Sequence, residues 1–237
     1  AIIYGAYMAL AQVDLKKLIA YSSVSHMGFV TLGLFVLNQQ GIEGAVLQMV
    51  NHGITTGGLF LCVGIIYERT HSRLIADNVG LAAPMPQYAT LLVIFALSSL
   101  GLPGTNSFVG EFLVLVGTFS WSKIAAAVAS LGIILAATYL LWMVQRVVFG
   151  VPSPHHLPNL RDLNQRELVT LVPLVLLIFW IGFYPNPLVS RMHQSVTNTL
   201  ASMSREKVAP TAHPSAGGTA PLLVDSDEQL EIQGESR

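Results

Sequence analysis

The stretch 97-LSSLGLPGTNSFVGEF-112 decides the fold of this 237-residue chain, because it places a helix break and an acid inside an otherwise apolar segment. No charged side chain occurs from Asn78 to Gly110 or from Phe112 to Ser122. A carboxylate at bilayer depth costs at least ~2.5 kcal/mol, so Glu111 needs a partner or a use. The Leu-Pro-Gly sequence before it interrupts a helix. We expect two half-helices joined by irregular backbone, beside an ionisable group, as in the binding centres of ion and proton transporters.

The composition of the whole chain agrees with a membrane protein. The chain is 52% hydrophobic and only 11% charged, whereas soluble domains carry roughly 25% charged residues. A net charge of −1 points to no nucleic-acid partner. Cys62 is the single cysteine, and no nucleotide, haem or iron–sulfur motif is present. We therefore expect neither a cofactor-binding residue nor a metal site in this chain.

Runs free of Asp, Glu, Lys and Arg mark the membrane spans. Each run exceeds the roughly 20 residues that a helix needs to cross the hydrocarbon core, and the runs cover residues 18–42, 44–67, 78–122 (interrupted by Glu111), 124–145 and 168–190. Residues 1–13 are too short to cross alone. We predict an all-α polytopic membrane protein with about five full transmembrane helices plus a partial one, of which one is discontinuous. The chain is expected to be the C-terminal fragment of a longer protein.

The sequence after the last span changes character. Apolar residues recur every three or four positions opposite polar ones, as in an amphipathic helix on a membrane or on a neighbouring subunit; they are Leu188, Met192, Val196, Leu200 and Met203. From Pro210 the chain is rich in Pro, Gly and Ser and then acidic, a composition typical of disorder. We expect a transmembrane domain at 1–189, an interfacial helix at 190–209 and a disordered acidic tail at 210–237.

The loops alternate in basic charge, which predicts the orientation. Three of them, at 14–17, 68–87 and 150–167 with their helix ends, hold Lys16, Lys17, Arg69, Arg73, Arg146, Arg161 and Arg166, whereas the alternate pair at 38–43 and 120–123 holds only Lys123. Basic residues are enriched on the cytoplasmic side of a membrane. We therefore expect the C-terminus on the non-cytoplasmic side.

Three titratable groups are predicted to share one depth. His26 lies nine residues after Lys17 and His52 nine residues after Glu43, so each sits about 14 Å into its helix, near the midplane of a ~30 Å core. Glu111 follows the break of the long third span and falls near the centre as well. Because histidine titrates near neutrality, such a row of groups can pass protons between water molecules.

A structural alternative exists for each of these groups. His26 could be held by Ser22, Ser23 or Ser25, and His52 by Asn51 or Thr55, which would leave both histidines without a role in transfer. Glu111 could form an ion pair that only fixes two helices. No lysine lies at mid-membrane depth in this chain to complete a switchable pair with the acid.

Three segments together resemble a known family. They are DLKKLIAYSSVSHMGFV at 14–30, GAVLQMVNHGITTGGLFLCVGIIYERTHSR at 44–73 and LSSLGLPGTNSFVGEF at 97–112. Over about residues 1–189 the chain resembles the M-type, or chain 4, antiporter-like subunits of respiratory complex I, and the glutamate of VGEF, where L- and N-type sister subunits have lysine, favours the M type. The resemblance implies the end of helix 9 and helices 10 to 14 of a fourteen-helix subunit, with helix 12 discontinuous.

The resemblance also implies a function and its residues. It points to a proton-translocating membrane-arm subunit of NADH:quinone oxidoreductase, in which Glu111, His26 and His52 transfer protons. FMN, iron–sulfur clusters and quinone would then lie in other subunits, and the partners would be the L- and N-type neighbours and the lipid of a bacterial inner (plasma) membrane. The alternatives are a subunit of a multi-subunit Na⁺/H⁺ antiporter with the same fold and a purely structural membrane subunit.

Overall fold

The computed structural model describes residues 1–150 and 160–208, with side chains described to residue 203. By its contacts the chain divides into Ala1–Ser202 and Met203–Arg237. The described part of the second unit continues helix α8 to Val208. The expected acidic tail at 210–237 lies outside the described residues.

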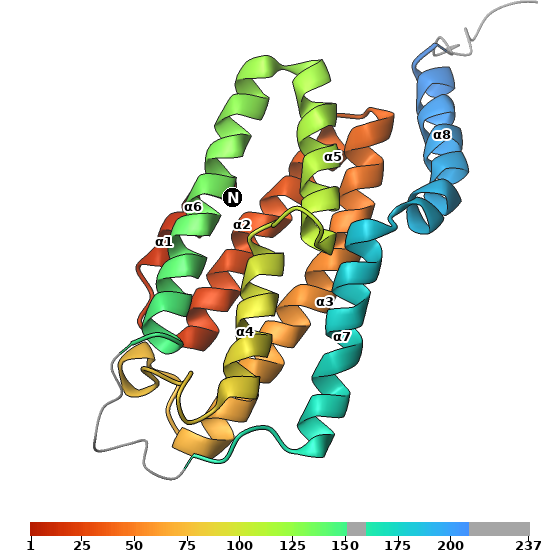
Figure 1. The fold of residues 1–237 in the computed structure, drawn as a ribbon. Helices are drawn as coiled ribbons and strands as arrows, with labels where there is room; N and C mark the ends of the chain where they lie inside the picture. Colours follow the sequence, from red (N-terminus) through yellow and green to blue (C-terminus); the bar gives the residue numbers. More distant parts are fainter. Residues whose placement is uncertain (151–159, 209–237) are drawn as a thin grey trace, which may run out of the picture. The chain divides into compact units, whose positions relative to one another are not determined.

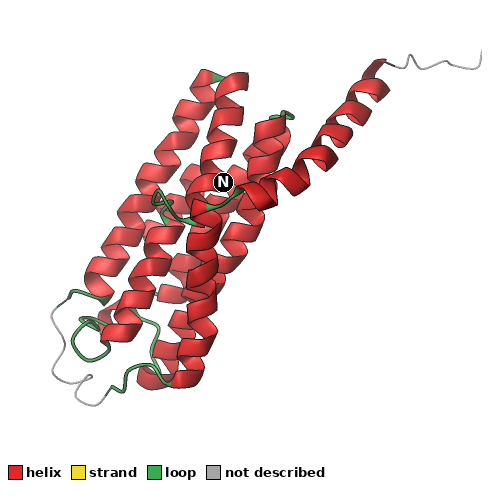
Figure 2. Cartoon of the chain, turned by 45° about the vertical axis from the view of Figure 1, so that its right-hand side comes forward, coloured by secondary structure: helices red, strands yellow, loops and turns green. Residues whose placement is uncertain are grey.

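The first unit is a bundle of helices, and Figure 2 draws no strand in the described part of the chain. Helix α1 covers Ile2–Leu10, α2 Leu15–Phe35, α3 Gln39–Thr70, α6 Lys123–Val147 and α7 Gln165–Phe183. The predicted interruption separates α4, Pro86–Ser99, from α5, Asn106–Trp121 (Figure 1). Four helices (α2, α3, α6 and α7) are long and apolar enough to cross a membrane singly. With the α4–α5 pair as the discontinuous fifth span and α1 as the partial one, the predicted fold class is confirmed.

Helix α3 is the central element of the bundle, because it contacts α2, α4, α5 and α7. Glycines allow the close approach of α5: a Cβ on Gly44 would lie 2.7 Å from the backbone nitrogen of Val114, and one on Gly110 would lie 3.0 Å from the Cα of Gln48. Small residues serve this purpose between membrane helices generally. Many large apolar side chains on the outer faces remain exposed, as expected where lipid replaces water as the solvent; examples are Phe35, Phe119, Ile134 and Leu176.

The break between α4 and α5 is stabilised by local backbone geometry. Gly101 and Gly104 adopt φ angles of +80° and +93°, which favour glycine. The backbone nitrogen of Leu102 donates to the carbonyl oxygen of Leu97 at 3.1 Å, and the hydroxyl of Thr105 donates to the carbonyl oxygen of Leu102 at 2.7 Å. The freed backbone groups are thus partly satisfied within the loop, as the membrane setting requires.

Helix α8 covers Asn186–Val208 and begins four residues before the amphipathic segment that the sequence predicts. Pro187 explains the earlier start, because proline is favoured in the first turn of a helix. Near the first turn of α3, the Nδ1 of His193 lies 2.7 Å from Oε1 of the buried Glu43. This contact joins α8 to α3.

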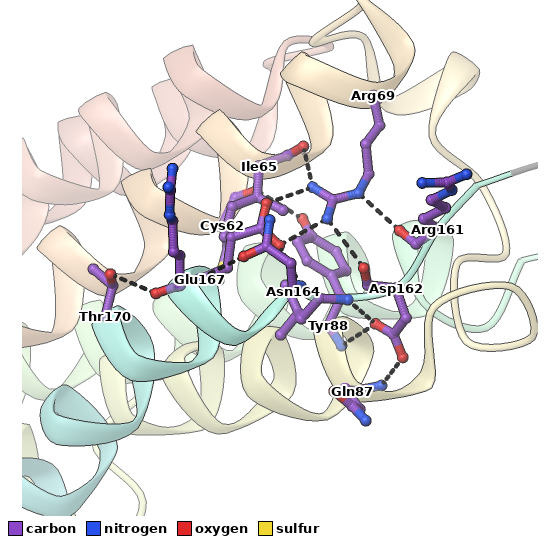
Figure 3. A network of polar contacts seen from close by, with 12 residues as sticks. Cys62, Ile65, Arg69, Gln87, Tyr88, Arg161, Asp162, Asn164, Glu167 and Thr170 are labelled. Carbon is purple, nitrogen blue, oxygen red and sulfur yellow. Dashed lines mark hydrogen bonds and ion pairs between the residues drawn. The ribbon is translucent and has the colours of Figure 1, made fainter.

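A network of ion pairs and hydrogen bonds connects α3, α4 and α7 at the end of the bundle where α3 ends (Figure 3). Arg69 donates from two nitrogens to the two carboxylate oxygens of Glu167, at 3.0 and 2.8 Å. The carboxylate of Asp162 accepts from the backbone nitrogens of Gln87 and Tyr88 at 2.9 and 3.1 Å, so it caps the first turn of α4. The first half of the broken span is therefore fixed to both neighbouring helices.

Candidate functional site

Glu111 lies in the second turn of α5, with its side chain enclosed by α2 and α3. It is 3% exposed and His26 is 2% exposed. Its Oε1 lies 2.7 Å from Nδ1 of His26 and accepts a hydrogen bond from Nε2 of Gln48 at 3.0 Å. A buried carboxylate needs such partners, because its charge is otherwise strongly disfavoured away from water. The structure therefore brings two of the three predicted site residues into direct contact.

The second ring nitrogen of His26 faces two hydroxyl groups from other helices. Its Nε2 lies 3.2 Å from the hydroxyl of Tyr139 on α6 and 3.4 Å from Oγ of Ser99 at the end of α4. In a neutral imidazole, one nitrogen donates and the other accepts. A proton on Nδ1 would donate to Glu111, which leaves Nε2 to accept from Tyr139. His26 thus has contacts suited to receiving a proton at one nitrogen and giving one from the other.

His52 lies next to His26. The ring centroids of the two histidines are 5.8 Å apart, with the ring planes tilted by 40°. His52 is half-buried, and Oγ1 of Thr56 lies 3.2 Å from its Nδ1. His26 is therefore the residue that contacts both of the other two predicted site residues, Glu111 through a hydrogen bond and His52 through its ring.

The serines that the sequence suggests as partners of His26 bond elsewhere. The hydroxyls of Ser22 and Ser23 donate to the carbonyl oxygen of Ile19, at 2.9 and 3.0 Å, and that of Ser25 donates to the carbonyl oxygen of Ile2 at 2.7 Å. A serine hydroxyl in a helix readily bonds the carbonyl one turn earlier. The partners of His26 come instead from α4, α5 and α6.

Asn51 and Thr55, the suggested partners of His52, also bond elsewhere, because they belong to a polar cluster at the helix break. Asn51 donates from Nδ2 to the backbone oxygen of Asn106 at 2.7 Å. The hydroxyls of Ser98 and Thr55 donate to Oδ1 of Asn106 at 2.7 and 3.2 Å. This buried cluster links α3 and α4 to the first residue of α5.

Gln48 and Tyr139 are site residues that sequence reasoning did not find. Gln48 is an amide within an apolar span, four residues before His52, and that position was a usable signal. Tyr139 carried no signal, because tyrosine is common in membrane helices and its partner lies 113 residues earlier in the chain. Oε1 of Gln48 and Oδ1 of Asn51 are buried acceptors without a hydrogen-bond partner among the described residues. Buried acceptors of this kind normally bind water.

The second carboxylate oxygen of Glu111 faces the helix break. A Cβ on Gly101 would lie 3.3 Å from Oε2 of Glu111. Glycine at this position therefore serves two purposes: it adopts the left-handed backbone conformation, and it leaves room beside the acid.

Comparison with known proteins identifies the family. The model of the family "NADH:quinone oxidoreductase/Mrp antiporter, TM" matches residues 1–136, which include His26, His52 and Glu111. The chain belongs to this family. The resemblance inferred from the three sequence segments is thereby confirmed, and the transmembrane part of the family is the part that matches.

Curated members of the family with similar sequences are subunits of one enzyme. The chain is 48% identical over 198 residues to NADH-ubiquinone oxidoreductase chain 4 of Marchantia polymorpha, covering 84% of this chain and 40% of the relative. It is also 48% identical over 198 residues to NADH-quinone oxidoreductase subunit M of Rhodobacter capsulatus, covering 84% of this chain and 39% of the relative. The chain thus spans about 40% of the length of these relatives.

Solved structures in the family share the fold. A chain of respiratory complex I from Thermus thermophilus with bound NADH superposes with a TM-score of 0.79 at 35% identity, covering 85% of this chain and 42% of that one. A chain of the Mrp complex from a Dietzia species superposes with a TM-score of 0.78 at 19% identity, covering 87% and 46%. At 19% identity the second match is evidence of the fold alone.

Proposed function

We propose that the chain forms part of an M-type, or chain 4, membrane-arm subunit of NADH:quinone oxidoreductase and transfers protons through His52, His26 and Glu111. The observation that carries this proposal is the buried 2.7 Å contact between Nδ1 of His26 and Oε1 of Glu111, with the ring of His52 centred 5.8 Å from that of His26. The identity with chain 4 and subunit M relatives supports the choice of complex.

The proposed transfer runs from His52 towards Glu111, because His52 is the least buried of the three. A centroid separation of 5.8 Å fits transfer between the two rings through one bridging water. The proton that arrives at Nε2 of His26 converts the imidazole to imidazolium. The imidazolium then gives its Nδ1 proton to the carboxylate of Glu111, and both groups end uncharged.

The contacts of Glu111 support a reversible charge on this carboxylate. In the ionised state, Oε1 receives hydrogen bonds from His26 and Gln48. After transfer of the Nδ1 proton from His26, the acid is neutral and remains within hydrogen-bond distance of His26 and Gln48. In the proposal, this step is the one coupled to the distant redox reaction.

The partners and location are part of the same proposal. We expect the L- and N-type subunits as neighbours, with FMN, iron–sulfur clusters and quinone in other subunits and none in this chain. The membrane is proposed to be a bacterial plasma membrane, and the end of the bundle with Lys16, Lys17 and Arg69 is proposed to face the cytoplasm, because positive residues prefer that side. Under this orientation α8 and the C-terminus lie on the opposite side.

The test is proton translocation by the intact complex in proteoliposomes, measured during NADH oxidation with added quinone. Glu111→Gln removes the titratable group but keeps its size and one hydrogen-bond acceptor. We expect normal assembly and a proton translocation rate reduced at least ~10-fold, because general acid–base groups typically contribute 10²–10⁴-fold. Glu111→Asp should recover part of the rate.

Glu68→Gln is the matched control, because Glu68 is an exposed acid on α3 and undergoes the same chemical change. Its translocation rate should equal that of the wild type. Unchanged translocation in a normally assembled Glu111→Gln complex would contradict the proposed role. Normal translocation driven by a sodium gradient without NADH would instead favour the Na⁺/H⁺ antiporter alternative.

A further inference from the structure

Among the described residues, the guanidinium group of Arg146 has no anionic partner. It lies in the last turn of α6, and its guanidinium carbon is 3.5 Å from the centre of the Trp142 ring. Its Nε and one terminal nitrogen are enclosed and have no hydrogen-bond acceptor in the described part of the chain. Unsatisfied buried donors are rare and costly, and more so on a charged group. Arg146 therefore calls for an acceptor beyond the described residues.

Arg146 also lines a cavity that is large enough for a ligand. Its volume is about 490 Å³, and it is lined by the turn before α2, the short 3₁₀ helix at Ile75–Asp77 and the end of α6. Two backbone hydrogen bonds of 2.9 Å hold the turn before α2 to the segment that leads into the 3₁₀ helix. The nitrogen of Leu15 donates to the carbonyl oxygen of Arg73, and the nitrogen of Ile75 donates to that of Val13. The cavity is therefore formed by segments that are far apart in the sequence and are held together by hydrogen bonds. Apart from Arg146 it is mainly apolar, with Val13, Ile75, Val79, Trp142 and Phe149 among the lining residues.

Two acids follow lining residues in the chain, Asp14 after Val13 and Asp77 after Ala76, and both have other partners. Asp14 accepts from the backbone nitrogen of Lys17 at 3.1 Å and lies 3.7 Å from Nε of Arg73. Asp77 accepts a hydrogen bond from the hydroxyl of Ser72. Neither acid forms an ion pair with Arg146 within the described residues. Among the described lining residues, Arg146 is therefore the single charged group, Gln145 is polar and the others are apolar or glycine.

We propose that this cavity binds an anionic phospholipid, with Arg146 holding the phosphate. Arginine can make two parallel hydrogen bonds to a phosphate, and a basic pocket between membrane helices on the cytoplasmic side is suited to lipid head groups. The rim supports a lipid over a soluble anion, because Val13 and Phe149 are 67% and 69% exposed and would meet acyl chains in a membrane. Trp142 stacks on the cation and faces the same apolar surroundings.

The test uses phosphatidylglycerol as the probe and the intact complex as the protein. Complex depleted of lipid by detergent is titrated with phosphatidylglycerol, and the bound lipid is counted by native mass spectrometry. Arg146→Gln should remove one tightly bound phosphatidylglycerol per complex or weaken it about tenfold, the effect of losing one charged hydrogen-bonded contact. An excess of inorganic phosphate should not displace the lipid.

Two further variants make the result decisive. Arg166→Gln removes an exposed arginine from the same proposed face, outside the cavity, and should leave the count unchanged. Val13→Trp fills the cavity from an exposed position and should lower binding even if Arg146→Gln fails to assemble. Equal binding in the wild type and in every assembled cavity variant would overturn the proposal and assign the acceptor of Arg146 to another protein segment. Displacement by inorganic phosphate alone would also overturn the proposed lipid.

Discussion

At the scale of single residues, the proximity of His26 to Glu111 and to His52 could be predicted, but the hydrogen bonds that these groups make could not. Counting residues from Lys17 and Glu43 placed His26 and His52 at one depth, because helical rise is constant. The contacts depend on how the helices rotate and pack against one another, and the local sequence of one helix does not predict this packing. Ser25, for example, precedes His26 directly in the sequence, whereas its hydroxyl donates to the carbonyl oxygen of Ile2.

Tyr139 provides a test at this scale. Tyr139→Phe removes the hydroxyl that lies 3.2 Å from Nε2 of His26 and keeps the buried ring. Because this group is the nearest hydroxyl to that nitrogen, its loss should favour the wrong tautomer of His26. We expect NADH-driven proton translocation to fall about fivefold with normal assembly, the equivalent of about 1 kcal/mol for one hydrogen bond. Ser120→Ala, which removes an exposed hydroxyl from α5, should have no effect. An unchanged translocation rate in Tyr139→Phe would show that this contact does not orient the histidine.

At the scale of elements, the spans and the interruption were accessible because both depend on local chemistry. Pro103 with Gly101 and Gly104 breaks the helix wherever the tertiary fold places it, and the apolar runs give the helix lengths. The support for the break was not accessible. Asn51 on α3 donates to the backbone oxygen of Asn106, 55 residues later in the chain, and Gly182 on α7 approaches Gly104, 78 residues earlier. Local sequence does not predict contacts between residues so far apart.

The packing of α7 on the break leads to a stability prediction. A Cβ on Gly182 would collide with the carbonyl oxygen of Gly104, which is rigid backbone. Gly182→Ala should therefore destabilise the protein by about 1–3 kcal/mol, the usual range for overpacking, and lower the thermal midpoint of the purified complex. Gly57→Ala is the matched control, because nothing lies within 4 Å of its added Cβ. The control should be neutral or slightly stabilising, since alanine is the better helix former. Equal midpoints for the two variants would contradict the proposed close packing of α7.

At the scale of the whole molecule, family membership could be predicted because long motifs identify it more firmly than any single residue does. The family match at 1–136 contains all three quoted segments, at 14–30, 44–73 and 97–112. The Arg69–Glu167 network and the cavity beside Arg146 could not be predicted. Both join segments that are far apart in the chain, 98 residues apart for the ion pair, and neither has a local motif.

The central claim is that Glu111 gains and loses a proton while the enzyme turns over. The most direct measurement is infrared difference spectroscopy of the intact complex, recorded before and after NADH is added in the presence of quinone. We predict a band of a protonated carboxyl group that forms or disappears with NADH, is absent in Glu111→Gln and persists in Glu68→Gln. An identical carboxyl band in the wild type and in Glu111→Gln would contradict it.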